Sequence, residues 1–337
     1  MENLKNLVIL ETEPSLLPKS GVAKSVSIPP LSTDTYISAA TSENTRKAYR
    51  SDIRHFEAWQ GRLPATTEMI MRYLQDYAAT LNPRTLSRRI IALRNWHAYQ
   101  GFPDPTNHPS IVKMLKGILR FHGKPKQKAR PLIPSELAQI IKYLSRFKTP
   151  VAVRDKALLL VGFFGALRRS ELIAICFEAI KWEKSGIEIL LPVSKTDQIH
   201  TGQYCAIPIG PENLCPVKAL EEWLALMNIT KGPIFRRVTA NGTLGQDALS
   251  PLSVNHIIKI RAQAAGIEKA NQFSSHSLRR GLATSAARAG SPLQAIMRAG
   301  RWKQTNTVME YIEASERFSD NAASNVMEKW VDKGTDS

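Results

Sequence analysis

The segment that most constrains the fold is 123–131, which reads Gly-Lys-Pro-Lys-Gln-Lys-Ala-Arg-Pro. It has no apolar periodicity and carries four positive charges, whereas helical periodicity is present on both sides of it. Such a segment is typical of an interdomain linker, and 337 residues suffice for two ordinary domains. We therefore predict a flexible segment at 1–33, a helical domain at 34–122, the basic linker, and a second domain at 132–337. The linker charge fits a solvated tether and equally a segment lying along a phosphate backbone.

Apolar residues of the first domain recur at helical spacing. Ser42 suits the cap of a helix on which Tyr49, Ile53 and Phe56 share one face. The same spacing predicts further helices at 67–80, from residue 84 onward, and at 110–120. A compact helical domain without strands is expected.

The second domain is predicted to be mainly helical, with one exception at 186–208. There Ile187 and Ile189 alternate with their neighbours and predict short strands on either side of a turn at 194–198. Helices are predicted at 216–227 and 253–265. The expected fold class is therefore mainly α with a small β-sheet.

The charge of the chain indicates a polyanionic partner. The formal net charge is +17 and the pI is about 9.9. Residues 34–130 hold 17 Lys and Arg against 7 Asp and Glu, a net charge of +10, while residues 310–337 hold 3 against 7. A basic amino-terminal module and an acidic tail are predicted.

Other classes of protein are disfavoured. No apolar run approaches the roughly 18–20 residues that span a bilayer, and the amino terminus lacks the pattern of a signal peptide, so we expect a cytoplasmic, nucleoid-associated protein without a membrane partner. Cys176, Cys205 and Cys215 form no CxxC pair and are expected to be reduced thiols. The scattered histidines and the lack of a GxxxxGK[ST] loop lead us to assign no metal and no cofactor.

Residue types that suit metal-free phosphodiester chemistry occur in short segments far apart in the chain. Arg168 and Arg279 are permanently charged forks that suit a phosphate gaining negative charge. His276 would share a helix face with Arg279. The indole N–H of Trp302 can donate to a phosphate oxygen but cannot carry a proton, and the phenol of Tyr311 is a suitable nucleophile.

These segments resemble those of a known family. Gly-Ala-Leu-Arg-Arg-Ser-Glu-Leu at 165–172, His-Ser-Leu-Arg-Arg-Gly-Leu-Ala-Thr at 276–284 and Val-Met-Glu-Tyr at 308–311 are similar to the tyrosine recombinases, the lambda integrase family that includes Cre recombinase and the Xer proteins. The resemblance covers about residues 34–330. It implies a helical, SAM-like core-binding domain followed by a mixed α+β catalytic domain.

The resemblance implies a catalytic set of Arg168, Lys195, His276, Arg279, Trp302 and Tyr311. Glu171 is then the acidic neighbour of Arg168, and Lys195, in a predicted hairpin turn, would protonate the leaving 5′-oxygen. Each residue taken singly also has a plainer interpretation. Arg168 and Glu171 could form an i,i+3 surface pair, Lys195 could be an ordinary turn lysine, and Trp302 and Tyr311 could be core residues.

A second set of residues is predicted to contact DNA, because its members are basic or polar and lie on helix edges or in the linker. The set is Arg46, Lys47, Arg50, Arg84, Thr85, Arg88, Arg89, Lys124, Lys126 and Lys128. For any one of them, a solvated helix face is the competing interpretation.

The expected function is site-specific DNA recombination. Tyr311 would attack a scissile phosphate, leaving a 3′-phosphotyrosyl link, and strands would exchange through a Holliday junction. The resemblance implies a homotetramer on two double-stranded DNA sites and allows for an accessory DNA-bending protein. The tail after Tyr311 could pack in a neighbouring subunit or close its own domain. A topoisomerase of type IB and a non-catalytic, architectural DNA-binding protein are the alternatives.

Overall fold

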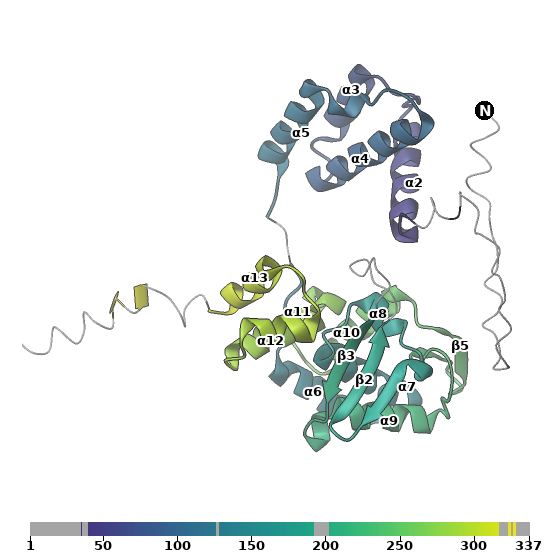
Figure 1. The fold of residues 1–337 in the computed structure, drawn as a ribbon, viewed down its shortest axis with the longest axis vertical. Helices are drawn as coiled ribbons and strands as arrows, with labels where there is room; N and C mark the ends of the chain where they lie inside the picture. The colour runs from purple at the N-terminus through teal and green to yellow at the C-terminus, as the bar shows by residue number, and fades with distance from the viewer. Residues whose placement is uncertain are drawn as a thin grey trace, which may run out of the picture. The chain divides into compact units, whose positions relative to one another are not determined.

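The computed structural model describes residues 40–125, 128–191 and 202–316, together with residue 35 and the pairs 323–324 and 326–327 (Figure 1). Lys195, its predicted turn and Lys126 lie outside the described residues, as do the segment 1–33 and most of the tail after 316. The chain separates into two compact units, Met1–Lys124 and Pro125–Ser337.

The first unit is built from helices whose first turns are capped by side chains that lie just before them in the sequence. Its elements are α2 (Glu43–Ala58), α3 (Thr67–Tyr77), α4 (Pro83–Gln100), the 3-10 turn η1 (Pro105–Asn107) and α5 (Pro109–His122). Ser42 caps α2 by accepting a hydrogen bond from the Thr45 N–H at 3.3 Å, and Asn82 caps α4 in the same way through Arg84. Phe56, Ile70 and Leu74 are among the buried residues that join these helices into one core.

The second unit is also mainly helical. Its helices are α6 (Pro134–Leu144), α7 (Pro150–Phe164), α8 (Arg169–Ile173), α9 (Pro216–Leu226), α10 (Pro251–Ala264), α11 (Ser275–Arg288), α12 (Leu293–Gly300) and α13 (Thr305–Glu316), with the 3-10 turns η2 (Phe177–Ala179), η3 (Glu212–Leu214) and η4 (Ala270–Gln272). Its strands are β1 (Ile180–Glu183), β2 (Gly186–Leu191), β3 (Gln203–Pro208), β4 (Arg236–Val238) and β5 (Leu244–Ala248). The prediction of a mainly helical chain with a small sheet is confirmed.

The strands form two small antiparallel sheets, ordered β1-β2-β3 and β4-β5. In the larger sheet Ile187 pairs with Ile207 and Ile189 with Cys205, and all four side chains are buried. The alternation that predicted strands in 186–208 therefore reflects one buried face. The sequence prediction placed strands only within 186–208 and was incomplete, because β1 and the β4–β5 hairpin also form. Strand β1 alternates apolar and charged residues over only four positions, and β4 and β5 show no alternation, so their sequences do not predict strands.

Helix α7 is the centre of the second unit. It is buried on nearly all sides, as expected of a helix that is apolar all round, and it packs against α6, α8, α9 and α11 (Figure 1). Helix α11 in turn packs against α12 and α13. The Leu132 N–H donates to the Ser277 carbonyl at 3.0 Å, so the start of the second unit lies along α11. This arrangement brings the chain segments around residues 130, 165, 280 and 305 together.

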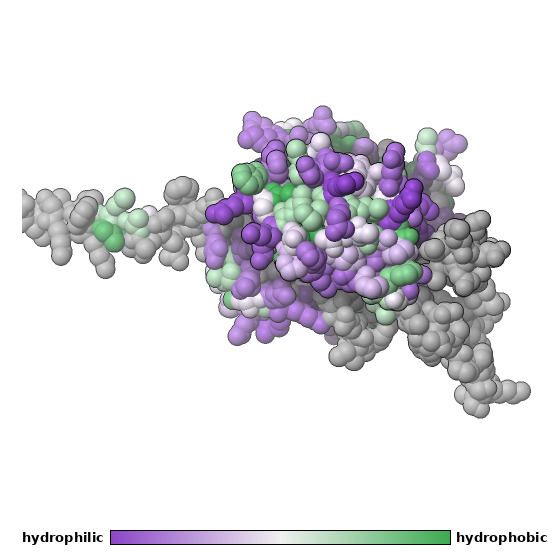
Figure 2. Space-filling model, turned by 90° about the horizontal axis from the view of Figure 1, so that it is seen from above, coloured by the Kyte–Doolittle hydropathy of each residue, from purple (hydrophilic) through white to green (hydrophobic). Residues whose placement is uncertain are grey.

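In the part of the chain that the structure describes, no helix is long and apolar enough to cross a membrane. On the face seen in Figure 2, hydrophilic residues surround a paler area of neutral and apolar residues. A mixed surface of this kind is ordinary for a folded protein.

Candidate active site

The turn between α7 and α8 positions Arg168. Helix α7 ends at Phe164, Ala166 adopts the left-handed backbone conformation with φ +43°, and Arg168 is the cap residue of α8. Left-handed backbone at an alanine is costly, and here it turns the chain sharply enough for Arg168 to follow the buried helix directly. The Arg168 side chain is 32% exposed, so its guanidinium is partly open to solvent.

Glu171 holds this arginine in place. Its carboxylate accepts a hydrogen bond from the Arg168 N–H at 2.9 Å and forms an ion pair with the Arg168 guanidinium. Burial by itself raises the pKa of Glu171, but these hydrogen bonds and the charges of Arg168 and Arg301 outweigh burial and hold the pKa below its usual value. Glu171 is therefore an ionised, buried carboxylate (4% exposed).

Arg279 reaches the same turn from α11. Its side chain is buried and donates to the Ala166 carbonyl. Burial, together with the charges of Arg168 and Arg301, lowers the pKa of Arg279 to about 10. Among the described residues its Nη2 has no hydrogen-bond partner. A cation that is buried, close to other cations and only partly hydrogen-bonded is suited to binding an anion.

The predicted aromatic residues lie beside this arginine. The Arg279 Cζ is 4.3 Å from the ring centroid of Trp302, and the Trp302 and Tyr311 rings meet edge to face at 6.1 Å. Both aromatic side chains also pack against the small cluster of Ala283, Ile296 and Val308. Trp302 and Tyr311 therefore pack in a core and also lie close to the arginines. The sequence analysis had weighed these two interpretations against each other.

His276 lies in the first turn of α11, one turn before Arg279. Its backbone N–H donates to the Ser274 hydroxyl at 3.3 Å, and its side chain is exposed. The structure therefore brings Arg168, Arg279, Trp302 and Tyr311 into one neighbourhood, with His276 at the exposed end of the same helix as Arg279. Lys195 falls outside the described residues.

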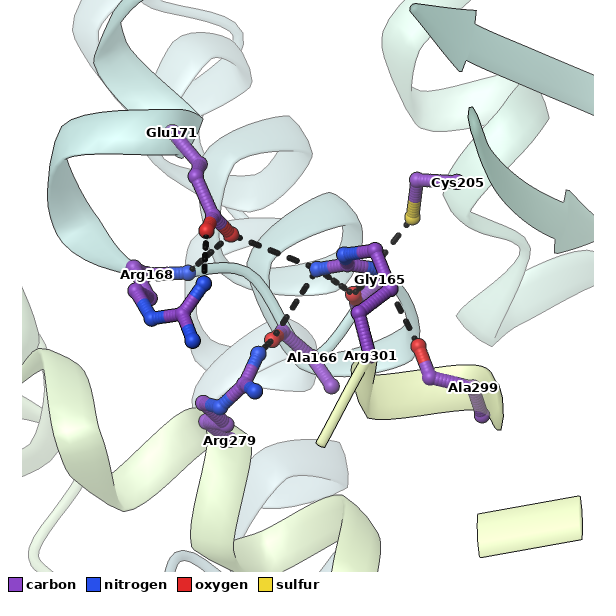
Figure 3. A network of polar contacts seen from close by, with 8 residues as sticks. All are labelled: Gly165, Ala166, Arg168, Glu171, Cys205, Arg279, Ala299 and Arg301. Atoms are coloured by element: carbon purple, nitrogen blue, oxygen red, sulfur yellow. Dashed lines mark hydrogen bonds and ion pairs between the residues drawn. The ribbon is translucent and has the colours of Figure 1, made fainter. Parts of the chain in front are cut away.

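Two further arginines at this site were missed by the sequence analysis. Arg280 lies over the ring of Tyr311, with its Cζ 5.1 Å from the ring centroid, and donates to the Ala129 carbonyl. The Arg301 side chain is 7% exposed and contacts Glu171 (Figure 3). Each stands next to a residue that the sequence did single out, and nothing in the local pattern distinguishes it from a surface arginine.

The residues predicted to contact DNA have differing environments. Lys47 and Arg50 are exposed on α2, and Lys47 pairs with Glu43; Arg84 is exposed on α4. Arg88 forms two 2.8 Å hydrogen bonds with the buried Asp52. In the remainder of the set, Arg46 donates to the Thr41 carbonyl, Thr85 is half-buried, Arg89 contacts Asp52, His55 and Tyr73, Lys124 is exposed, and Lys128 pairs with Glu310.

Within the described ranges, no group of three or more His, Cys, Asp or Glu side chains could hold a metal ion. Cys176, Cys205 and Cys215 are free thiols. Burial raises the pKa of the Cys205 thiol, which donates to the Gly165 carbonyl at 3.4 Å beside the arginine cluster.

Comparison with known proteins places the chain in a family. A model described as the phage integrase family matches residues 131–317, and a model described as the phage integrase N-terminal SAM-like domain matches residues 34–100. The integrase/recombinase XerD homolog of Selenomonas ruminantium is 36% identical over 297 residues, covering 86% of this chain and 86% of that protein. Recombinase Cre of Escherichia phage P1 is 25% identical over 296 residues, covering 81% and 84%.

The fold agrees with this assignment. The XerH site-specific recombinase, in a post-cleavage complex with a palindromic difH substrate, superposes with a TM-score of 0.56 at 20% identity, covering 77% of this chain and 72% of that one. The chain belongs to the phage integrase family. It is a tyrosine recombinase, with a SAM-like amino-terminal domain and an integrase catalytic domain.

Proposed function

We propose that this protein is a site-specific DNA recombinase in which Tyr311 attacks a scissile phosphodiester. The observation that carries the proposal is the convergence of Arg168, Arg279, Trp302 and Tyr311, which come from separate segments of the second unit. Arg279 and Arg168 supply charge for an anion, and Tyr311 supplies a nucleophile beside them.

In the proposed reaction the Tyr311 phenol oxygen bonds to phosphorus and the bond from phosphorus to the 5′-oxygen breaks. The phenol proton passes to a base, a role we assign to His276, and the leaving 5′-oxygen takes a proton from Lys195. The products are a 3′-phosphotyrosyl link and a free 5′-hydroxyl, and attack by a second 5′-hydroxyl reverses the step. One phosphoester bond replaces another in each step, so the bond energy is conserved and no external energy source is needed.

Electrostatic stabilisation would supply most of the rate enhancement. Uncatalysed phosphodiester cleavage is slow enough that the site must contribute on the order of 20 kcal/mol. Arg168 and Arg279 would act as preorganised donors, because Glu171 holds Arg168 and the Ala166 carbonyl holds Arg279. Trp302 adds an indole N–H for a non-bridging oxygen.

Double-stranded DNA is the proposed partner. The net charge of +17 favours a polyanion, and the XerH structure contains its DNA substrate. We propose that the set Arg46, Lys47, Arg50, Arg84, Thr85, Arg88, Arg89, Lys124, Lys126 and Lys128 contacts the duplex. Strand exchange through a Holliday junction requires two duplexes, so we further propose a homotetramer on two sites, with an accessory DNA-bending protein as an optional partner.

Covalent capture from a random pool of DNA tests the proposal and finds the target site in the same experiment. The full chain is incubated with a library of randomised duplexes, protein–DNA adducts that survive denaturant are isolated, and the attached DNA is sequenced and its modified peptide identified by mass spectrometry. We expect adducts on Tyr311 through a 3′-phosphate for the wild type, none for Tyr311→Phe, and wild-type levels for Tyr204→Phe, which removes an exposed phenol from the same unit. Attachment through another residue would refute the assignment.

The same captured duplex separates the rival functions. A recombinase joins strands between two copies of its site, whereas a topoisomerase of type IB relaxes one duplex without pairing sites. An architectural DNA-binding protein forms no covalent adduct at all.

A further inference from the structure

Arg301 has a left-handed backbone conformation, which residues other than glycine rarely adopt. It ends α12 with φ +56°, between Gly300 and Trp302, and its side chain is only 7% exposed. A left-handed backbone and a buried cation each carry a cost. Contacts elsewhere must offset both costs, and these contacts lie across the site.

The Arg301 guanidinium spans the gap between two parts of the active site (Figure 3). Nη1 and Nη2 each donate to the Gly165 carbonyl at 3.2 Å, and Nη2 also lies 3.4 Å from the Ala166 carbonyl. Nη2 is 3.3 Å from Glu171 Oε2, the oxygen that accepts the Arg168 N–H. Through these contacts the end of α12 is tied to the turn that positions Arg168.

Arg279 shares this connection, since it donates to the same Ala166 carbonyl. On the other side, Arg301 is followed at once by Trp302, whose ring passes so close to Gly300 that a Cβ at Gly300 would lie 1.8 Å from the indole Cζ3. Trp302 in turn contacts Tyr311. The backbone at Arg301 is therefore the junction between the two arginines and the two aromatic residues.

We propose that Arg301 is a positioning residue that fixes the Trp302–Tyr311 segment relative to Arg168 and Arg279. It acts through Glu171 and the Gly165 and Ala166 carbonyls, and its terminal nitrogens are directed to these protein acceptors. The proposal rests on the proposed function, because it assigns Arg301 to the same transesterification. Misplacing reacting groups by about 1 Å can lower a rate about 100-fold.

The first test measures single-turnover covalent attachment to the captured duplex, and measures duplex affinity separately in a Tyr311→Phe background. Arg301→Met removes the guanidinium, Arg301→Gly removes it while suiting the left-handed backbone, and Arg301→Lys keeps the charge. We expect Met and Gly to lower the attachment rate constant about 100-fold and to change affinity less than about threefold, with partial recovery for Lys. The matched control is Arg298→Met, which removes an exposed charge from α12, and it should attach at the wild-type rate. Equal losses of rate and affinity, or wild-type attachment by Arg301→Gly, would overturn the proposal.

The second test is independent of activity. Backbone hydrogen exchange in the full chain should rise over residues 302–312 in Arg301→Gly and stay unchanged over 43–58 in the first unit. Unchanged exchange at 302–312 would also overturn the proposal. If the wild type forms no adduct, the proposed function fails, while the exchange experiment still decides whether Arg301 holds this segment.

Discussion

The guanidinium of Arg280 lies over the ring of Tyr311, while its neighbour Arg279 lies over the ring of Trp302. Successive arginines on α11 thus contact different aromatic residues. Arg280 also donates to the Ala129 carbonyl, so it connects Tyr311 to the segment that enters the second unit. The consecutive residues Arg279 and Arg280 therefore make different contacts.

Replacing Arg280 should weaken the contact between α11 and α13. Arg280→Met loses the hydrogen bond to Ala129 and the interaction with the Tyr311 ring, and we expect the free energy of unfolding to fall by about 1–3 kcal/mol. Urea denaturation measures the change. Arg288→Met, at the exposed end of α11, should alter stability by less than about 0.5 kcal/mol, and equal effects of the two variants would contradict the interpretation.

The adjacent pair Arg168 and Arg169 provides a test of the arginine assignment. Arg168 pairs with Glu171 at the site, whereas Arg169 is exposed in the first turn of α8. Arg168→Gln should lower the rate of covalent attachment by about 100-fold or more, as expected for loss of one transition-state donor. Arg169→Gln should stay within about threefold of wild type. The assignment is wrong if the larger loss follows the second substitution.

Glu171 should make stability depend on pH. Its pKa in the folded protein is below the unfolded value, so its ionised form contributes stability above a pH of about 4.5 that is lost as the pH falls further. Glu171→Gln should be less stable than wild type by about 3 kcal/mol at pH 7, because Arg168 and Arg301 lose their buried carboxylate partner, and this difference should shrink below pH 4. Unfolding curves at several pH values measure the difference, with Glu221→Gln on the exposed face of α9 as the control. A difference that stays constant with pH would contradict the ionised assignment.

Two helical glycines should respond oppositely to alanine. A Cβ at Gly281 would lie 2.0 Å from the Leu132 carbonyl oxygen, which is backbone and cannot rotate away, whereas a Cβ at Gly117 in α5 would meet nothing within 4 Å. Gly281→Ala should lower the free energy of unfolding by about 3 kcal/mol, and Gly117→Ala should raise it by about 0.5–1 kcal/mol. Thermal denaturation of both variants checks the signs. A neutral Gly281→Ala would mean that the 128–132 segment is not held against α11.

Local features of the structure were largely predictable because their causes are local. Ser42 caps a helix through a hydrogen bond to a residue three positions along, and the alternation at Ile187 and Ile189 marks one buried strand face. The segments around Arg168, His276 and Tyr311 were recognisable because their residue types and spacing are those of a family. The alternation in β1 covers only four residues, and β4 and β5 have none, so these strands were missed.

The fold class, the cap of α2 at Ser42, the family and the catalytic residues proposed for the site were predicted from the order of amino acids. Arg168 and Glu171 lie three residues apart, and their pairing was already an expectation from the sequence. The partners of the other arginines became known only from the folded arrangement: Arg279 meets Trp302, Arg280 meets Tyr311, and Arg301 meets Glu171. The physical reason is how far apart in the sequence the interacting residues lie. A helix cap or a strand face depends on neighbours a few residues away, whereas the environment of an arginine depends on carbonyls, carboxylates and rings that other segments bring to it through folding.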